Sequence, residues 1–153
     1  MHTAKLNLKH GLILINSTPI AVDEKGGLTE FIAKLCSPPT RTDEGRTQYR
    51  SLKKISIFGR SADIVIEIGN GVVCAITFLF DFIEFFESSI LESKILKACE
   101  KSLNVKFTSD HPSTAFLEPC EWGQAIFFYD AKQGDLSLDI TFQQSSGKPA
   151  TRS

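Results

Sequence analysis

Cysteine and histidine are the side chains of this chain best suited to nucleophilic and acid–base catalysis, and histidine is scarce. The sequence holds four cysteines and three histidines. Cysteine catalysis needs a base within hydrogen-bond reach of the thiol. His111, nine residues before Cys120, is the one histidine whose spacing suggests such a pair, and no recognisable motif surrounds either residue. A loop histidine and a packed cysteine are the simpler interpretation.

Metal and phosphate sites have no support in the spacing of the residues. The cysteines, at positions 36, 74, 99 and 120, lie 38, 25 and 21 residues apart, so none forms the close pair of a zinc knuckle. The sequence has no glycine-rich phosphate loop, no HExxH pattern and no EF-hand spacing. We therefore expect no cofactor and no metal. We expect buried free thiols, with disulfides as the alternative.

Carboxylates that could transfer protons occur in two places. Asp81, Glu84 and Glu87 follow helical spacing, and Glu118 and Glu121 form a second pair. General acid–base catalysis requires a carboxyl group that a cleft removes from water. A solvent-exposed face accounts for these residues without any reaction. The sequence therefore favours a protein that is not an enzyme.

The same two segments combine acidic groups with aromatic rings, a composition typical of protein interfaces. Residues 80–87 contain four phenylalanines and three carboxylates, and residues 118–122 end with the only tryptophan. The alternative places Phe82 and Phe86 in the core and Trp122 over a sheet edge. Such an acidic and aromatic surface suits a basic partner. The predicted partner-binding residues are Asp81, Phe82, Glu84, Phe85, Glu87, Glu118, Glu121 and Trp122.

The charge balance argues against nucleic acid as a partner. The chain has 17 basic and 18 acidic residues, a formal net charge of −1 and a pI near 6.3, so it has no overall attraction to phosphate. Arg46, Tyr49 and Arg50 come nearest to a mixed basic and aromatic patch. The acidic residues that begin at Asp81 would repel a phosphate backbone. We expect no nucleic-acid binding.

The N-terminal segment predicts a cytoplasmic protein. Lys5 and Lys9 precede the apolar residues 11–15, but this run is too short for the core of a signal peptide. Asn16 to Pro19 then interrupts it. No apolar stretch approaches the roughly 20 residues that a membrane-spanning helix needs. We expect no membrane association.

Periodicity predicts two helices and a series of strands. Helical spacing covers Leu28 to Leu35, where the prolines at 38 and 39 end it, and recurs over residues 90–103. Alternating apolar residues predict strands over 12–15, 20–22, 55–57, 64–68, 72–79, 124–130 and 136–142, with a hairpin turn at Asn70-Gly71. Hairpin links favour antiparallel pairing. The predicted fold is α+β, with two main helices packed on one face of one or two antiparallel sheets.

Length and internal similarity bear on the domain organisation. The 153 residues suit one domain, which we place at residues 1–142, followed by a flexible tail over 143–153. Residues 28–36 align without gaps on 91–99 and match at four of nine positions, and residues 76–78 (Ile-Thr-Phe) recur at 140–142. This similarity suggests two tandem helix–β-β-β units, 11–80 and 81–142. Two unrelated helix-plus-hairpin units are the alternative.

The element order from Leu28 to Pro39, followed by Tyr49, the strand at Ile55 and a hairpin, resembles the units of the bacterial β-lactamase inhibitor protein family and its single-unit lipoprotein relatives. The resemblance covers roughly residues 11 to 142, at the level of element order. The glycine that usually precedes the proline exit is replaced here by Cys36-Ser37. The resemblance implies paired helix-plus-sheet units and assigns a role to no residue.

A small, mildly acidic domain without catalytic motifs also resembles the immunity proteins that neutralise bacterial toxins. This resemblance implies a cytoplasmic inhibitor that binds a cognate protein toxin and covers its active or substrate-binding surface. The alternative is a small ligand-binding domain or enzyme with an apolar cavity. A third interpretation is a homo-oligomer that pairs through its sheet edges. We expect a monomer or a homodimer.

Overall fold

The computed structural model describes residues 1–80, 96–97, 100–101, 104–111, 114–117, 120–130 and 135–143. This part of the chain is 55% strand and 7% helical, and it has no helix of seven or more residues. The predicted α+β class with two main helices is therefore wrong. The protein is mainly an antiparallel β structure.

The first predicted helix is only one turn long. Residues 28–35 contain α1, Glu30–Ala33, and the Thr29 hydroxyl makes no capping hydrogen bond. Leu28 and Cys36, at the two ends, instead form β-bridges with Val22 and Ser51. Because short isolated helices are marginal in water, these tertiary contacts decide the local structure. The second predicted helix, 90–103, falls mostly outside the described residues; 96, 97, 100 and 101 are helical.

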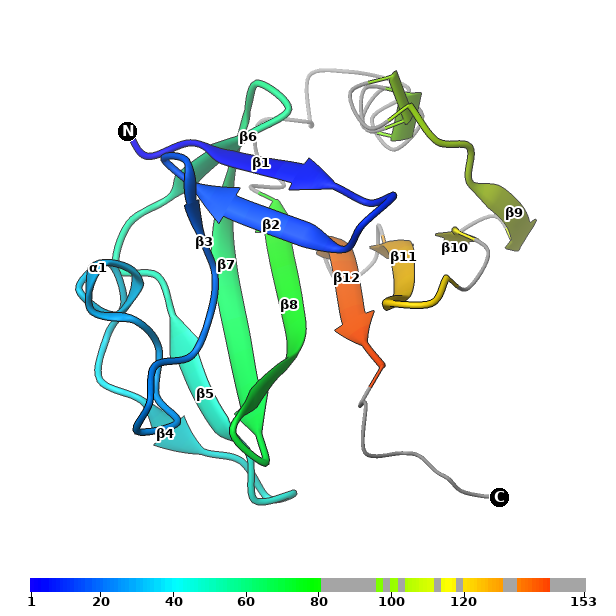
Figure 1. Cartoon of the computed structure of the whole chain (residues 1–153). Coiled ribbons are helices and arrows are strands. Elements are labelled where there is room, and N and C mark those ends of the chain that lie inside the picture. The colour runs from blue at the N-terminus through cyan, green and yellow to red at the C-terminus, as the bar shows by residue number, and fades with distance from the viewer. Residues whose placement is uncertain are drawn as a thin grey trace, which may run out of the picture.

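Nine strands form one antiparallel sheet (Figure 1). Its order is β4-β5-β7-β8-β12-β11-β10-β9, with β6 paired to β7. The bounds are β4 Thr40–Arg41, β5 Thr47–Arg50, β6 Ile55–Ile57, β7 Arg60–Gly69, β8 Val72–Phe80, β9 Thr108–His111, β10 Thr114–Phe116, β11 Gly123–Asp130 and β12 Asp135–Phe142. Each half of the chain thus supplies a meander, and the last strands of the two halves, β8 and β12, pair at the centre.

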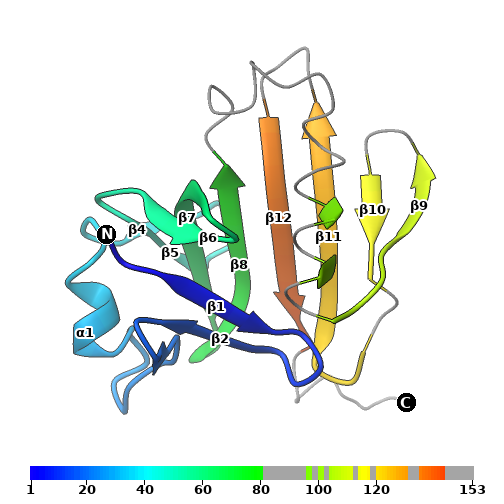
Figure 2. The ribbon, with the colours of Figure 1, turned by 90° about the horizontal axis from the view of Figure 1, so that it is seen from above.

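A second, three-stranded sheet lies across one face of the large sheet (Figure 2). It consists of β1 Ala4–Asn7, β2 Leu12–Ile15 and β3 Thr18–Pro19. Ile13 and Ile15 of the small sheet join Ile66, Phe78 and Leu138 of the large sheet in one buried cluster. We call this covered face the inner face and the opposite one the outer face. Burial of the apolar side chains between the two sheets drives the folding of both.

The predicted hairpin at Asn70-Gly71 is confirmed. Both residues have positive φ angles, 55° and 76°, as a two-residue turn between twisted strands requires. The predicted alternation also holds along β7, where Ile64, Ile66 and Ile68 are buried. It also holds along β8 from Cys74 to Phe80, while Val72 is exposed. The pairing of β7 with β8 shifts at a bulge: Glu67 pairs with Ala75 and Ile68 with Val73, which leaves Cys74 as the extra residue.

The recurring triplets meet at their first residues, at the centre of one sheet. Ile76 and Ile140 are cross-strand neighbours on β8 and β12. A two-fold axis through this pair would map residues 76–78 onto residues 140–142, because the two strands are antiparallel. The two halves of the chain therefore share a single continuous sheet. They do not form two separate sheets that each pack against a long helix.

Candidate functional site

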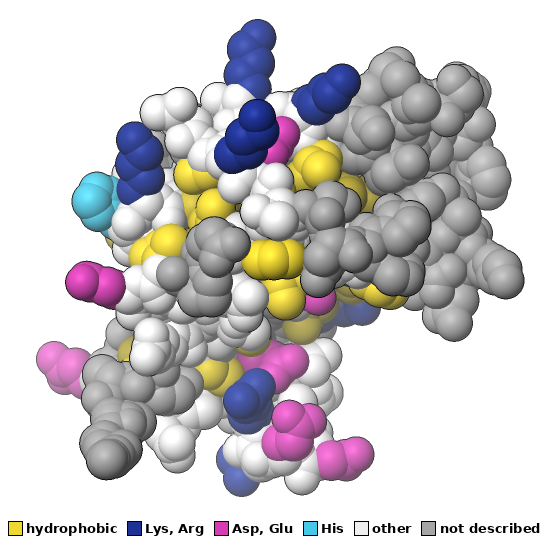
Figure 3. Space-filling view, turned by 90° about the vertical axis from the view of Figure 1, so that its right-hand side faces the viewer, with side chains coloured by type: hydrophobic (Ala, Val, Ile, Leu, Met, Phe, Trp, Pro, Cys, Tyr) yellow, Lys and Arg dark blue, Asp and Glu magenta, His cyan; other side chains and the backbone are white. Residues whose placement is uncertain are grey.

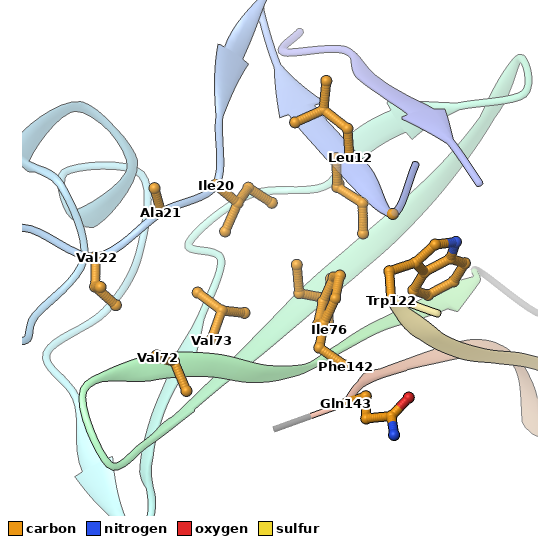
Figure 4. A pocket seen from close by; sticks show the side chains of 12 residues that line it. Leu12, Ile20, Ala21, Val22, Val72, Val73, Ile76, Trp122, Phe142 and Gln143 are labelled. Atoms are coloured by element: carbon orange, nitrogen blue, oxygen red, sulfur yellow. The ribbon is translucent and has the colours of Figure 1, made fainter. Parts of the chain in front are cut away.

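An apolar groove opens between the small sheet and the inner face of the large one. Its volume is about 470 Å³. We call it the Trp122 groove and define it by the side chains of Leu12, Ile20, Val72, Val73, Trp122 and Phe142. In Figure 4, Leu12 and Ile20 lie opposite Val72 and Val73, and Trp122 lies at one end. Leu12 and Val72 are each 41% exposed, so the groove presents apolar surface to solvent.

The groove exists because β8 and β12 separate. Their pairing ends at Ala75 and Thr141, although β12 continues beside β11 as far as Phe142. The bulge at Cys74 lies at this point of β8, and a bulge bends its strand and increases its twist. Val72 and Val73 therefore turn away from the end of β12. The small sheet covers the resulting gap from one side and leaves the groove.

Trp122 is held in a defined position at the groove wall. Its indole Nε1 donates a hydrogen bond of 2.7 Å to the backbone oxygen of Leu8. Its ring packs against Phe142 with centroids 5.8 Å apart and planes inclined at 51°. Gly11 lies directly against the indole, since a Cβ there would stand 2.5 Å from the indole Cγ. The β1–β2 connection and the end of β12 thus fix the ring together.

The groove is built for binding by apolar contact. Its twelve lining residues include Gln143 and otherwise only glycine and apolar residues, so its walls carry no nucleophile and no titratable group. Glu121, next to Trp122, is exposed and carries the nearest acidic charge along the chain. Figure 3 shows one side of the molecule, where hydrophobic side chains reach the surface between charged ones.

The two buried cysteines are poor nucleophiles in this setting. Cys36 and Cys74 are buried free thiols, and the side chain of Cys120 is partly exposed. Burial raises the pKa of the Cys36 and Cys74 thiols, which keeps both protonated at neutral pH. Within the described ranges, no group of three or more His, Cys, Asp or Glu residues could hold a metal ion. The suggested Cys120–His111 pair involves a histidine side chain outside the described part.

A second candidate feature, which is polar, lies on the outer face of the large sheet. Asp139 of β12 has Thr77 of β8 and Ile126 of β11 as its cross-strand neighbours. Removal from water raises the pKa of the Asp139 carboxyl group, while hydrogen bonds from the hydroxyls of Ser137 and Thr77 lower it in part. The surroundings of Asp139 therefore disfavour the ionised form of its carboxyl group.

This environment predicts a pH-dependent gain in stability for Asp139→Asn. The pKa of Asp139 in the folded protein is above the ordinary value of 3.8. At neutral pH the ionised carboxylate therefore lowers the stability of the folded protein. At low pH the carboxyl group is protonated in both the folded and the unfolded protein, and this loss of stability disappears. We expect the variant to melt at a higher temperature than the wild type at pH 7, and the gain to vanish near pH 3. Thermal melts at both pH values measure this difference. Asp43→Asn, at an exposed loop position, is the control; an equal gain at both pH values would contradict the explanation.

The predicted partner-binding residues have different outcomes. Glu121 is exposed and Trp122 lines the groove. The remaining six lie outside the described residues: Asp81, Phe82, Glu84, Phe85, Glu87 and Glu118. Sequence reasoning missed Leu12 and Val72, because each begins a strand and looks like an ordinary core position. It had no signal for the desolvation of Asp139.

No described helix has the length and apolar character needed to cross a membrane. Comparison of the chain with protein-family models, curated proteins and solved structures finds no match.

Proposed function

We propose that this chain is a non-enzymatic binding protein of the toxin-immunity kind. It receives an apolar protrusion of a cognate protein toxin in the Trp122 groove and so covers the toxin's active or substrate-binding surface. The observation that carries the proposal is the preformed groove, in which a fixed tryptophan stands beside the solvent-exposed side chains of Leu12 and Val72.

The energetics of the groove favour a protein partner. Burial of apolar surface contributes about 25 cal/mol per Å², and tryptophans in dry pockets are frequent hot spots of interfaces. The hydrogen bond to Leu8 and the contact with Phe142 hold the Trp122 ring before binding, so association orders little further. The exposed Glu121 beside the groove suits a basic rim on the partner and would raise the association rate.

We propose that the protein acts in the cytoplasm, as a monomer or a homodimer. Cys36 and Cys74 are buried free thiols, which a reducing compartment maintains.

Val72→Asp should weaken toxin binding by about 30-fold or more, the size of a hot-spot loss of about 2 kcal/mol. The substitution places a carboxylate where the partner's apolar surface would remove it from water. Leu52→Asp makes a similar change at a leucine that is 64% exposed and lies outside the groove, so it serves as the matched control. Isothermal titration of the three proteins with the toxin measures the effect. Equal affinities would contradict the groove as the docking site.

The partner itself can be sought by affinity capture from the native host with the same three proteins. The proposal expects one protein that the wild type and Leu52→Asp retain and Val72→Asp loses. That protein, expressed alone, should inhibit growth, and coexpression of this chain should relieve the inhibition. A captured protein without toxicity, or no difference between the variants, would count against the function.

The groove volume supports a second candidate, a small apolar ligand. About 470 Å³ falls within the roughly 300–1,000 Å³ typical of small-molecule sites. A series of linear alcohols tests it, because each buried methylene contributes about 0.8 kcal/mol, or roughly fourfold in affinity. Trp122, the only tryptophan, reports binding by its fluorescence. Saturable quenching with this chain-length dependence would favour the ligand; no response would favour the protein partner.

A further inference from the structure

The outer face of the large sheet carries a mixed apolar and acidic surface around Asp139. Cross-strand pairing places Thr77, Asp139, Ile126 and Phe116 in one row across β8, β12, β11 and β10. The next row contains Leu79 and Phe128 on either side of Ser137. We call this surface the Asp139 face and define it by Thr77, Leu79, Phe116, Ile126, Phe128 and Asp139. All six side chains are at least partly exposed, and Phe128 is 37% exposed.

The small sheet does not cover this surface. Its residues Ile13 and Ile15 pack with the inner-face side chains, and Figure 2 shows β1 and β2 crossing on one side of the large sheet only. The Asp139 face therefore leaves Phe128 exposed and the side chains of Leu79, Phe116 and Ile126 partly exposed. Contiguous apolar surface of this kind is frequent at interaction sites.

Charge pairing separates Asp139 from Asp63 and Glu67, two acidic residues of the outer face whose side chains the structure describes. Asp63 is neutralised by Arg50 at 2.8 Å and by Lys54 at 3.3 Å. Glu67 is paired with Arg46 at 3.3 Å. Asp139 has two hydroxyl donors, and no Lys, Arg or His within the described stretches forms an ion pair with it. It is a partly desolvated carboxylate without a cation in a mainly apolar setting.

We propose that the Asp139 face docks a basic protein segment that places an arginine on the Asp139 carboxylate. A guanidinium group donates two parallel hydrogen bonds to a carboxylate and stacks on neighbouring apolar and aromatic side chains. Here Ile126 and Phe128 flank the acid and would exclude water from the pair, which strengthens its attraction. The occupant is therefore an arginine flanked by apolar residues.

Other occupants match the charge less well. A nucleic acid would bring phosphates against an unpaired carboxylate and be repelled. A purely apolar partner would bury that carboxylate without a counter-charge, which is costly. The site lies on the opposite face of the sheet from the Trp122 groove, so the inference goes beyond the proposed function and stands independently of it.

A synthetic peptide, acetyl-Leu-Thr-Arg-Thr-Leu-amide, tests the site. When it is extended, its two leucines and its arginine point to one side, as alternate residues of a strand do. A second peptide carries citrulline, which keeps the shape of arginine without its charge. NMR titration of the full chain measures both affinities from backbone amide shifts in β8, β11 and β12, while the Trp122 indole signal reports the groove separately.

We expect the arginine peptide to bind the wild type at least about tenfold more tightly than the citrulline peptide, as a close charge pair should contribute. Asp139→Asn should abolish the difference between the peptides. Asp43→Asn, which changes the net charge equally at an exposed position, should retain it. Equal affinities of the two peptides for the wild type, an unchanged preference in Asp139→Asn, or shifts confined to the Trp122 indole would each overturn the proposal.

Discussion

Phe78→Ala should lower the free energy of unfolding by about 3–5 kcal/mol, a large part of the roughly 5–15 kcal/mol that stabilises a typical domain. Phe78 is completely buried on the inner face of β8. Its cross-strand neighbours are Ile64 and Leu138, so its ring lies where the two meanders meet. The substitution removes the contacts that the ring makes in the dry core. It also leaves a cavity, which the hydrogen-bonded strands cannot move to fill. Urea denaturation followed by circular dichroism measures the loss.

Phe128→Ala is the matched control on the opposite face. Phe128 lies on β11 with its ring on the outer face and is 37% exposed. Its truncation should cost at most about 1 kcal/mol, because surface substitutions rarely exceed this. The two variants remove the same atoms from strands of one sheet. A similar loss for both would mean that the outer face is packed against something and would contradict the assignment of the core to the inner face.

The long strands could be predicted from the sequence because their signals are local. Alternating isoleucines from 64 to 68 and the Asn70-Gly71 turn specify strand, turn and return strand within a few residues. The pairing of β8 with β12 joins residues about 60 positions apart, and no local pattern encodes it. Sequence reasoning therefore found six of the strands, missed β1, β4, β5, β9 and β10, and left open whether the strands form one sheet or two.

The helix at residues 28–35 shows how a correct pattern can mislead. Leu28 and Ile32 are buried, as helical spacing predicted, while Phe31 is 41% exposed. The pattern reported which side chains enter the core, and one helical turn is enough to place them there. The length of the helix depended on the β-bridges at Leu28 and Cys36, which are tertiary contacts.

The candidate site could be predicted only in part. Trp122 was identified because a lone tryptophan beside acidic residues is conspicuous in a sequence. The groove around it results from the separation of β8 and β12 and from the crossing of the small sheet, and both are consequences of the tertiary fold. No local pattern distinguishes Asp139, because its desolvation depends on neighbours from two other strands.

Gly11→Ala should both lower the free energy of unfolding and disturb the wall of the Trp122 groove. Gly11 has a φ of 66°, which costs an L-residue about 1–2 kcal/mol. The new Cβ would also stand 2.5 Å from the Trp122 Cγ, so the indole must move. Movement would break the hydrogen bond to Leu8, worth about 1 kcal/mol, and disturb the contact with Phe142. We expect a total loss of about 3 kcal/mol, measured by urea denaturation, together with a red shift of tryptophan emission.

Gly26→Ala separates the two causes of that loss. Gly26 has a similar φ of 83°, but no atom lies within 4 Å of the position of a new Cβ. Its substitution should show the backbone cost alone and leave the emission of Trp122 unchanged. If Gly11→Ala and Gly26→Ala lose equal stability and neither alters the emission, the indole is not held by the β1–β2 connection. The groove would then lack the fixed wall on which its binding role depends, whichever partner it receives.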